Sequence, residues 1–182
     1  MQIYLDMDGV LADFVSASIA AHGRDDSHDS VKTWDYSTEQ WEISHGKFWS
    51  ACQGRSFWAG LSPYSHHLEL LEMCEAYADE VYFLTSPSST GHAECLAGKS
   101  DWIKAWFGGM YQKNLIPTKH KHLLAASDRV LIDDSSGNIE SWVKAGGIGI
   151  GFGQPWNQYD ACMSNLAAKL AAVQELLESR PV

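Results

Sequence analysis

The sequence predicts an α/β protein whose helices cover a mostly parallel, doubly wound sheet of the Rossmann-like kind. Short apolar runs that favour β structure occupy residues 2–5, 80–84 and 129–132, and each run ends in polar residues. A helix-like stretch follows each run, and strands that alternate with helices are typical of a parallel sheet. The length of 182 residues suits one domain of this kind with a modest insertion.

Helices are expected where apolar residues recur at helical spacing and where proline or glycine marks an end. The expected helices cover residues 11–21, 64–78 and 93–107, a stretch that begins near residue 136, and residues 161–179. The last of them carries Leu166, Leu170, Val173 and Leu177 at helical spacing, which predicts a packing face. One more strand, rich in glycine, is expected at residues 148–152.

Residues 22–61 break this alternation, because they are polar, rich in Ser, Asp and His, and dense in aromatic residues. We interpret this segment as a small, mainly helical cap inserted after the first helix. The core domain then comprises residues 1–21 and 62–182. In so small an insertion, aromatic side chains more often form a hydrophobic core than a binding pocket.

The composition narrows the classes of function. A formal net charge of −10 and a pI near 5.1 argue against a nucleic-acid polymer as partner. The four cysteines lie far apart, which predicts neither a zinc site nor a disulfide framework. No apolar run approaches the length that crosses a membrane, and Asp6 follows too early for a secretory signal, so we expect a cytoplasmic protein with no membrane partner. A homodimer is left open.

Polar side chains follow the three apolar runs at the point where each strand is expected to end. They are Asp6, Asp8, Thr85, Ser86, Asp133 and Asp134. In open α/β sheets ligands bind beyond the carboxyl ends of the strands, so the loops after three strands can converge there. Carboxylates that lie so close repel one another unless a cation sits among them, and oxygen ligands suit Mg²⁺ better than zinc. The sequence therefore predicts a magnesium site formed by Asp6, Asp8 and one or both of Asp133 and Asp134.

A carboxylate in this position can act as a nucleophile toward phosphorus. Asp6 is the candidate nucleophile, and Asp8 is the candidate acid and base that protonates the leaving oxygen and then activates water. The Thr85 hydroxyl and the Ser86 backbone N–H are suited to hold phosphoryl oxygens. A lysine should balance the remaining charge, and the candidates are Lys121 and Lys119, followed by Lys99.

Each of these residues also has a purely structural interpretation. A strand-end aspartate often caps the next helix, and Thr85-Ser86 before Pro87 is typical of a turn. The lysines would then be solvated residues at the start of a helix. Two aspartates around Met7, with acidic partners further along the chain, favour the catalytic interpretation.

The order of these residues resembles the four motifs of the haloacid dehalogenase superfamily. Those motifs are Asp6-Met7-Asp8-Gly9-Val10, Thr85-Ser86, a lysine near position 121, and Leu131-Ile132-Asp133-Asp134. Within the superfamily the chain resembles the 5′(3′)-deoxyribonucleotidases and their bacterial and phage relatives, on Ala12-Asp13-Phe14, Phe57-Trp58, Thr85-Ser86-Pro87 and Lys99 ahead of Trp102. The resemblance implies that Phe14, Phe57 and Trp58 help enclose the nucleotide base and sugar. The family usually has an arginine after its aspartate pair, where this chain has Ser135.

The predicted protein is a magnesium-dependent phosphomonoester hydrolase that works through an aspartyl-phosphate. The resemblance implies a 5′(3′)-deoxyribonucleotidase, whose small-molecule substrate is a (deoxy)nucleoside monophosphate. One alternative keeps this chemistry with a sugar phosphate or another small phosphomonoester, and a second is a non-catalytic nucleotide-binding protein on the same fold. A haloacid dehalogenase proper is disfavoured, because cleavage of a carbon–halogen bond does not need the leaving-group acid that Asp8 provides.

Overall fold

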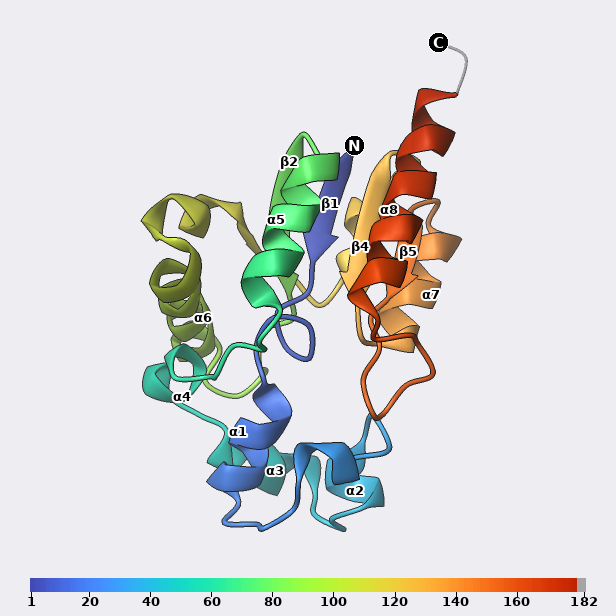
Figure 1. Cartoon of the computed structure of the whole chain (residues 1–182). Coiled ribbons are helices and arrows are strands. Elements are labelled where there is room, and N and C mark those ends of the chain that lie inside the picture. The colour runs from blue at the N-terminus through green and yellow to red at the C-terminus, as the bar shows by residue number, and fades with distance from the viewer. Residues whose placement is uncertain (180–182) are drawn as a thin grey trace.

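The computed structural model describes residues 1–179 and contains a five-stranded sheet in the order β3-β2-β1-β4-β5 (Figure 1). All four neighbouring pairs are parallel. The strands are β1 Gln2–Leu5, β2 Glu80–Thr85, β3 Leu115–Pro117, β4 Arg129–Asp133 and β5 Ile148–Gly151. The expected doubly wound parallel sheet is thus confirmed.

Helices cover both faces of the sheet, so its central strands are apolar on both sides. They are α1 Phe14–Ala21, α2 Tyr36–Glu39, α3 His45–Ala51, α4 Arg55–Ala59, α5 His67–Tyr77, α6 His92–Phe107, α7 Ser136–Lys144 and α8 Met163–Glu178. In β1, Ile3 and Leu5 pack into the cluster that includes α5, α6 and α8, whereas Tyr4 packs against Trp142 of α7 on the other face. Figure 1 shows α5 and α8 in front of the sheet and α7 behind it.

Two helices begin later than the sequence predicts. Residues 7–12 form a compact loop in which the Leu11 and Ala12 N–H groups both donate to the Met7 carbonyl, and α1 begins only after Asp13 caps it by accepting from the Ser16 N–H at 2.9 Å. The helix expected from residue 64 begins at His67, because residues 64–67 form a turn first. The remaining expected helices and strands agree with the observed ones to within two residues at their ends.

The sequence analysis missed β3, a three-residue strand at the edge of the sheet. It pairs only with β2, where Leu115 lies opposite Phe83 and Pro117 opposite Thr85. A strand this short carries no periodic pattern of its own, and a terminal proline is typical of an edge.

Helices α1, α2 and α3 form a separate bundle beyond the carboxyl ends of the strands (Figure 1). Their hydrophobic cluster consists of Val15, Ile19, Val31, Tyr36, Trp41, Phe48 and Cys52. The chain enters and leaves this bundle through adjacent segments, since the Asp13 N–H donates to the Ser62 carbonyl at 2.8 Å and the Tyr64 N–H to the Leu11 carbonyl at 2.9 Å. The division of the chain at residues 22 and 61 stays a prediction. We use "cap" for residues 22–61 below.

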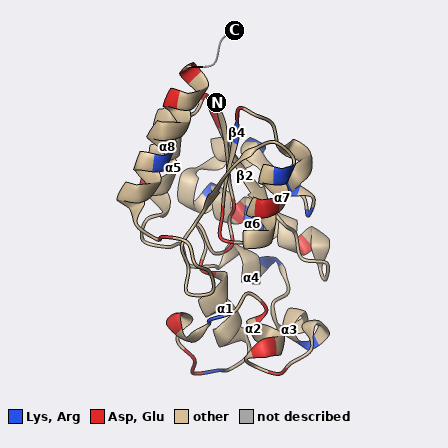
Figure 2. Ribbon diagram, turned by 90° about the vertical axis from the view of Figure 1, so that its right-hand side faces the viewer, with Lys and Arg blue, Asp and Glu red and all other residues tan. Residues whose placement is uncertain are grey.

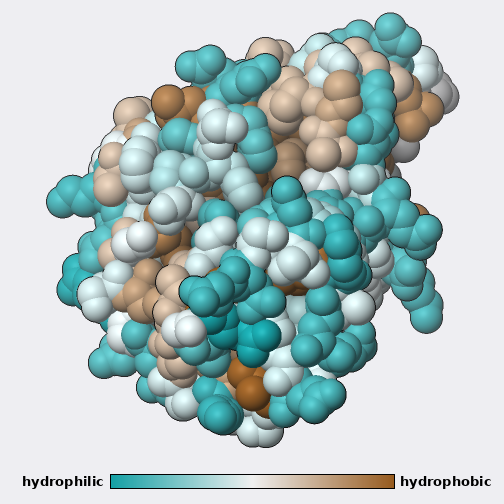
Figure 3. Space-filling view, turned by 60° about the horizontal axis from the view of Figure 1, so that its bottom comes forward, coloured by the Kyte–Doolittle hydropathy of each residue, from teal (hydrophilic) through white to brown (hydrophobic). Residues whose placement is uncertain are grey.

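The surface carries mixed charges, and Figure 2 shows acidic positions at both ends of the molecule. Figure 3, which brings the cap end forward, shows polar side chains over much of that face and apolar ones in small groups. Among residues 1–179, no helix is both long and apolar enough to cross a membrane. The cysteines are free, and Cys162 alone among them is exposed.

Candidate active site

The loop after β1 places two aspartates at the centre of the sheet edge. The Asp6 N–H donates to the Ile132 carbonyl of β4 at 2.9 Å, which fixes the start of the loop between the two strands. Gly9 has a φ of +79°, in the left-handed region that glycine adopts without strain, and this turn carries the chain back over the site. Asp6 is buried and Asp8 is partly buried.

Three buried carboxylates meet where β1 and β4 end. Asp6, Asp133 and Asp134 each offer an oxygen, and these oxygens lie within 4.8 Å of one another. Burial, and then the nearby Asp6 charge, raises the pKa of Asp133 to about 6. Burial and the charges of Asp133 and Asp6 raise the pKa of Asp134 well above its usual value. The cluster therefore holds negative charge at a substantial cost unless cations neutralise it.

Lys121 supplies one of those cations. Its Nζ lies 2.7 Å from Asp6 Oδ1 and 2.7 Å from Asp133 Oδ2, and the side chain is buried on the short helix η3, Lys121–Leu124. Burial alone would lower the pKa of this ammonium, but the two carboxylates outweigh it and raise the pKa. One ammonium among three carboxylates still leaves an excess of negative charge.

Lys99, buried on α6, forms a second ion pair, with the partly buried Asp8. Its Nζ lies 2.5 Å from Asp8 Oδ2 and 2.5 Å from Thr85 Oγ1, and 5.0 Å from the ring centre of Trp58. Burial raises the pKa of Asp8, and the Lys99 charge acts against that rise. Lys99 therefore links the ends of β1 and β2, because it contacts Asp8, the candidate acid and base, and Thr85, a candidate phosphate-binding residue.

The carboxylate oxygens of the acidic cluster suit a hard divalent cation as ligands. Both oxygens of Asp133 already accept hydrogen bonds, from the Ser135 N–H, from Lys121 and from the Asn138 amide. Asp134 Oδ1 is buried and has no hydrogen-bond partner among the described residues. A buried carboxylate oxygen without a partner is costly unless a cation binds it. The residues present thus fit Mg²⁺, which prefers oxygen ligands.

A cavity of about 490 Å³ opens above these groups, between the core and the cap. Asp6, Asp8, Asp134 and the exposed Lys119 line its core side. Its aromatic lining consists of Phe14, Trp34, Tyr36, Phe48, Trp49, Trp58 and Trp156. The phosphate end of a substrate would meet carboxylates and cations here, and its organic end would meet aromatic rings.

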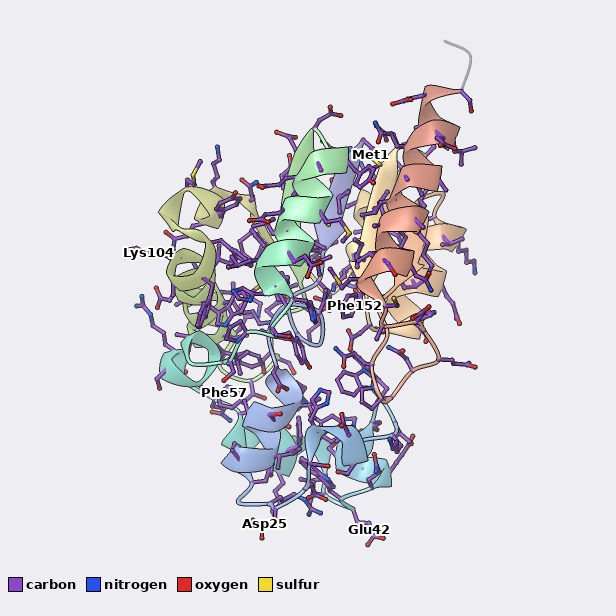
Figure 4. All side chains as sticks on the ribbon, in the orientation of Figure 1. Met1, Asp25, Glu42, Phe57, Lys104 and Phe152 are labelled. Carbon is purple, nitrogen blue, oxygen red and sulfur yellow. The ribbon has the colours of Figure 1, made fainter. Side chains whose placement is uncertain are left out.

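The structure brings most of the predicted residues together. Asp6, Asp8, Phe14, Trp58, Ser86, Lys119 and Asp134 line the cavity. Thr85, Lys121 and Asp133 are buried beside them. Lys121 contacts Asp6 and Asp133, and Thr85 accepts from Lys99, which also contacts Asp8. Phe57 is outside this lining: it is half-buried on α4, its ring centre lies 5.2 Å from that of Trp58, and Figure 4 labels it at the lower end of α4, toward α1.

Several lining residues were not singled out from the sequence. In the cap these are Trp34, Asp35, Tyr36, Ser37, His45, Phe48 and Trp49, and in the core Asn138 and Trp156. The density of aromatic residues marked the cap, but no periodicity indicated which rings face the core. Trp156 follows the end of β5, and position after a strand end is also what identified the aspartates. The ends of β5 were hard to predict, however, because the strand is rich in glycine.

Solved structures of similar fold are hydrolases of one class. A haloacid dehalogenase-like family hydrolase from Xanthomonas campestris superposes with a TM-score of 0.62 at 11% identity, over 98% of this chain and 93% of that one. A predicted phosphatase from Clostridium acetobutylicum gives a TM-score of 0.56 at 11% identity, over 94% and 98%. A hydrolase of the same superfamily from Deinococcus radiodurans gives 0.51 at 16% identity, over 100% and 98%. The protein thus has the fold of the haloacid dehalogenase-like hydrolases.

The family itself follows from the sequence comparison. The profile described as 5′ nucleotidase, deoxy (Pyrimidine), cytosolic type C protein matches residues 1–178, and the chain belongs to this family. It is therefore a phosphatase that acts on phosphomonoesters. A comparison with curated proteins found no match.

Proposed function

We propose that the protein is a magnesium-dependent 5′(3′)-deoxyribonucleotidase that hydrolyses (deoxy)nucleoside monophosphates. The observation that carries this proposal is the cavity, whose core side holds Asp6 and Asp8 and whose other walls are aromatic. Aromatic rings can stack on the face of any nucleobase, so such walls suit a nucleoside better than a sugar alone. The family's description as a deoxy 5′ nucleotidase of cytosolic type supports both the substrate class and a cytosolic location.

The reaction would proceed in two steps on Asp6. Its carboxylate attacks phosphorus while Asp8 gives a proton to the leaving ester oxygen, which departs as the nucleoside hydroxyl and leaves an aspartyl-phosphate. Asp8 then takes a proton from water, whose oxygen attacks phosphorus and restores the Asp6 carboxylate. The raised pKa of Asp8 supports the acid role, since its protonated form persists to a higher pH than that of a free aspartate.

Other residues of the chain would hold the phosphoryl group and the cation. Lys121 stays close to Asp6, where it can balance charge on the phosphoryl oxygens, and the Thr85 hydroxyl and Ser86 N–H can donate to those oxygens. Asp134 is the better direct ligand for Mg²⁺, because its Oδ1 is free while both Asp133 oxygens are occupied. Mg²⁺ would neutralise the cluster and polarise the phosphoryl group.

Two solved structures of similar fold contain ligands of the kind proposed here. The Deinococcus radiodurans hydrolase was solved with bound phosphate and sodium. A putative hydrolase from Bacillus subtilis, with a TM-score of 0.54 at 11% identity over 93% and 97% of the two chains, was solved bound to magnesium and shows interdomain movement. By analogy, the cap would close over the base and exclude water during catalysis. Phe14 and Trp58 would enclose the base, with Phe57 supporting them.

The test combines a substrate panel with one substitution. We expect phosphate release from deoxynucleoside and nucleoside monophosphates in the presence of Mg²⁺, with kcat/KM above that for sugar phosphates. Asp6→Asn should lower kcat by more than about 1,000-fold, because the nucleophile is lost. Asp25→Asn is the matched control, since Asp25 is exposed at the far end of the cap (Figure 4) and should leave kcat unchanged.

Two outcomes would contradict the proposal in different ways. Turnover of sugar phosphates with no turnover of any nucleotide would keep the chemistry and reject the substrate class. Unchanged turnover in Asp6→Asn would reject the covalent mechanism itself.

A further inference from the structure

Trp156 lies in the loop between β5 and α8, on the wall of the cavity next to the acidic cluster. Its indole Nε1–H donates to Asp134 Oδ2 over 2.8 Å. The indole N–H is a donor only, so this bond occupies one carboxylate oxygen without adding negative charge. The other oxygen, Oδ1, is the buried one without a partner, and the indole therefore leaves Asp134 with a single oxygen for a cation.

The loop that carries Trp156 is fixed to the core. The Asn157 amide donates to the Asp134 carbonyl at 2.9 Å and to the Phe152 carbonyl at 2.8 Å. The Gln154 amide donates to the Gly9 carbonyl of the nucleophile loop at 2.5 Å. Figure 4 shows Phe152 where β5 passes into this loop. The indole thus reaches Asp134 from a loop whose Gln154 and Asn157 side chains are hydrogen-bonded to the loops after β1 and β4.

The ring of Trp156 also contacts the cap. It packs against the hydrophobic cluster of the bundle formed by α1, α2 and α3, and its centre lies 5.4 Å from that of the His28 imidazole. His28 belongs to the short helix η1, His28–Ser30, and its Nε2 lies 2.9 Å from the Tyr64 hydroxyl. One side chain therefore touches a carboxylate of the core and a residue of the cap at the same time.

We propose that Trp156 is a positioning residue, which orients Asp134 toward the divalent cation and makes that orientation depend on where the cap lies. Groups that hydrogen-bond to metal-ligating carboxylates fix their direction, and their loss commonly weakens metal affinity 10- to 100-fold. Because the Trp156 ring contacts His28, a movement of the cap would displace the indole and alter its hydrogen bond to Asp134. This inference rests on the metal site of the proposed function.

The first experiment measures Mg²⁺ affinity of the full chain by isothermal titration calorimetry. Trp156→Phe keeps a ring against His28 but removes the N–H, so we expect the Mg²⁺ Kd to rise by about tenfold. Trp106→Phe is the matched control, because Trp106 is a half-exposed tryptophan on α6 outside the cavity, and its Kd should equal that of the wild type. A Kd for Trp156→Phe within twofold of the wild type would overturn the proposal. Trp156→Leu, which also lacks a donor, replaces it if the Phe variant does not fold.

The second experiment tests the link to the cap with the same readout. His28→Ala should raise the Mg²⁺ Kd by about threefold in the wild-type background, as expected for residues coupled through packing. In the Trp156→Phe background the same change should have no effect, because the bond that transmits it is gone. No effect of His28→Ala on the wild type, or an equal effect in both backgrounds, would reject the link.

The readout separates this inference from the proposed function. If the wild type binds no Mg²⁺, the proposed metal site fails and the role of Trp156 fails with it. If the wild type and Trp156→Phe bind Mg²⁺ equally, the proposed function stands and only the role of Trp156 is wrong. A wild type that binds Mg²⁺ but hydrolyses no nucleotide would reject the substrate class and leave the role of Trp156 to be decided by the two Kd values.

Discussion

At the scale of single residues, the site depends on two lysines of the same chemistry with different partners. Lys121 contacts the nucleophile candidate Asp6, and Lys99 contacts Asp8 and Thr85. Each ammonium is buried, and a buried charge is costly unless an opposite charge pairs with it. Lysine was expected to balance phosphate charge, and in the structure both lysines also pair with acidic side chains of the protein.

Gly9 gives the prediction at this scale. A Cβ added to Gly9 would lie 2.3 Å from Asp134 Oδ2, and its φ of +79° disfavours any other residue. We expect Gly9→Ala to lower the free energy of unfolding by at least about 1 kcal/mol, because a non-glycine residue is strained at this φ. It should also weaken Mg²⁺ binding by displacing Asp134. Urea unfolding and calorimetry check the two effects.

Gly146 provides the matched control for the loss of stability that a non-glycine residue causes at a positive φ. Its φ is +95°, and a Cβ there would meet nothing within 4 Å. Gly146→Ala should show the loss of stability alone, with the Mg²⁺ Kd unchanged. If both variants bound Mg²⁺ like the wild type, the contact of Gly9 with Asp134 would have no part in the metal site.

At the scale of elements, the close approach of α4 and α6 positions one wall of the cavity. Gly98 of α6 lies against α4, where an added Cβ would be 2.5 Å from the Arg55 carbonyl oxygen and 2.6 Å from Trp58 Cβ. The two helices can approach this closely only because position 98 has no side chain. Trp58 is thereby held over Lys99 and on the cavity wall.

Gly98→Ala tests whether the close contact between α4 and α6 positions Trp58. The added methyl should push α4 away, lower the free energy of unfolding by about 1–3 kcal/mol and raise KM for a nucleotide, because Trp58 moves. Gly46→Ala is the control, since Gly46 lies in α3 with nothing within 4 Å of its Cβ and should gain helix stability. An unchanged KM and stability in Gly98→Ala would show that α4 does not depend on this contact.

At the scale of the whole molecule, three buried carboxylates lie where the core meets the cap. The chain has a formal net charge of −10, and Lys121 forms ion pairs with two of these carboxylates, Asp6 and Asp133. Burial and mutual repulsion raise the pKa of both Asp133 and Asp134. The folded protein should therefore be less stable without a cation than with one.

Thermal unfolding with and without Mg²⁺ tests this expectation. At a free Mg²⁺ concentration 100 times the Kd, binding should stabilise the folded state by about 2.7 kcal/mol, which raises Tm by several degrees. Asp134→Asn should abolish that rise, while the metal-free Tm stays equal to or above that of the wild type, since a repelling charge is removed. A Tm of the wild type that does not respond to Mg²⁺ would count against the metal site.

The sequence by itself determined the local features of this protein. Apolar runs, prolines and glycines marked four of the five strands and the main core helices, and the aspartates after β1 and β4 marked the acidic cluster. These features could be predicted because each depends on residues close together in the chain: a strand is a short apolar run, and parallel strands bring their ends to one edge.

Only the tertiary structure decided how distant segments meet. Whether Lys99 or Lys121 pairs with a given carboxylate, which aromatic rings of the cap face the core, and where Trp156 donates its N–H depend on packing between elements far apart in the sequence. The edge strand β3 likewise exists through its pairing with β2. Side-chain direction across such contacts is set by the shape of both partners, and a local pattern carries information about one of them only.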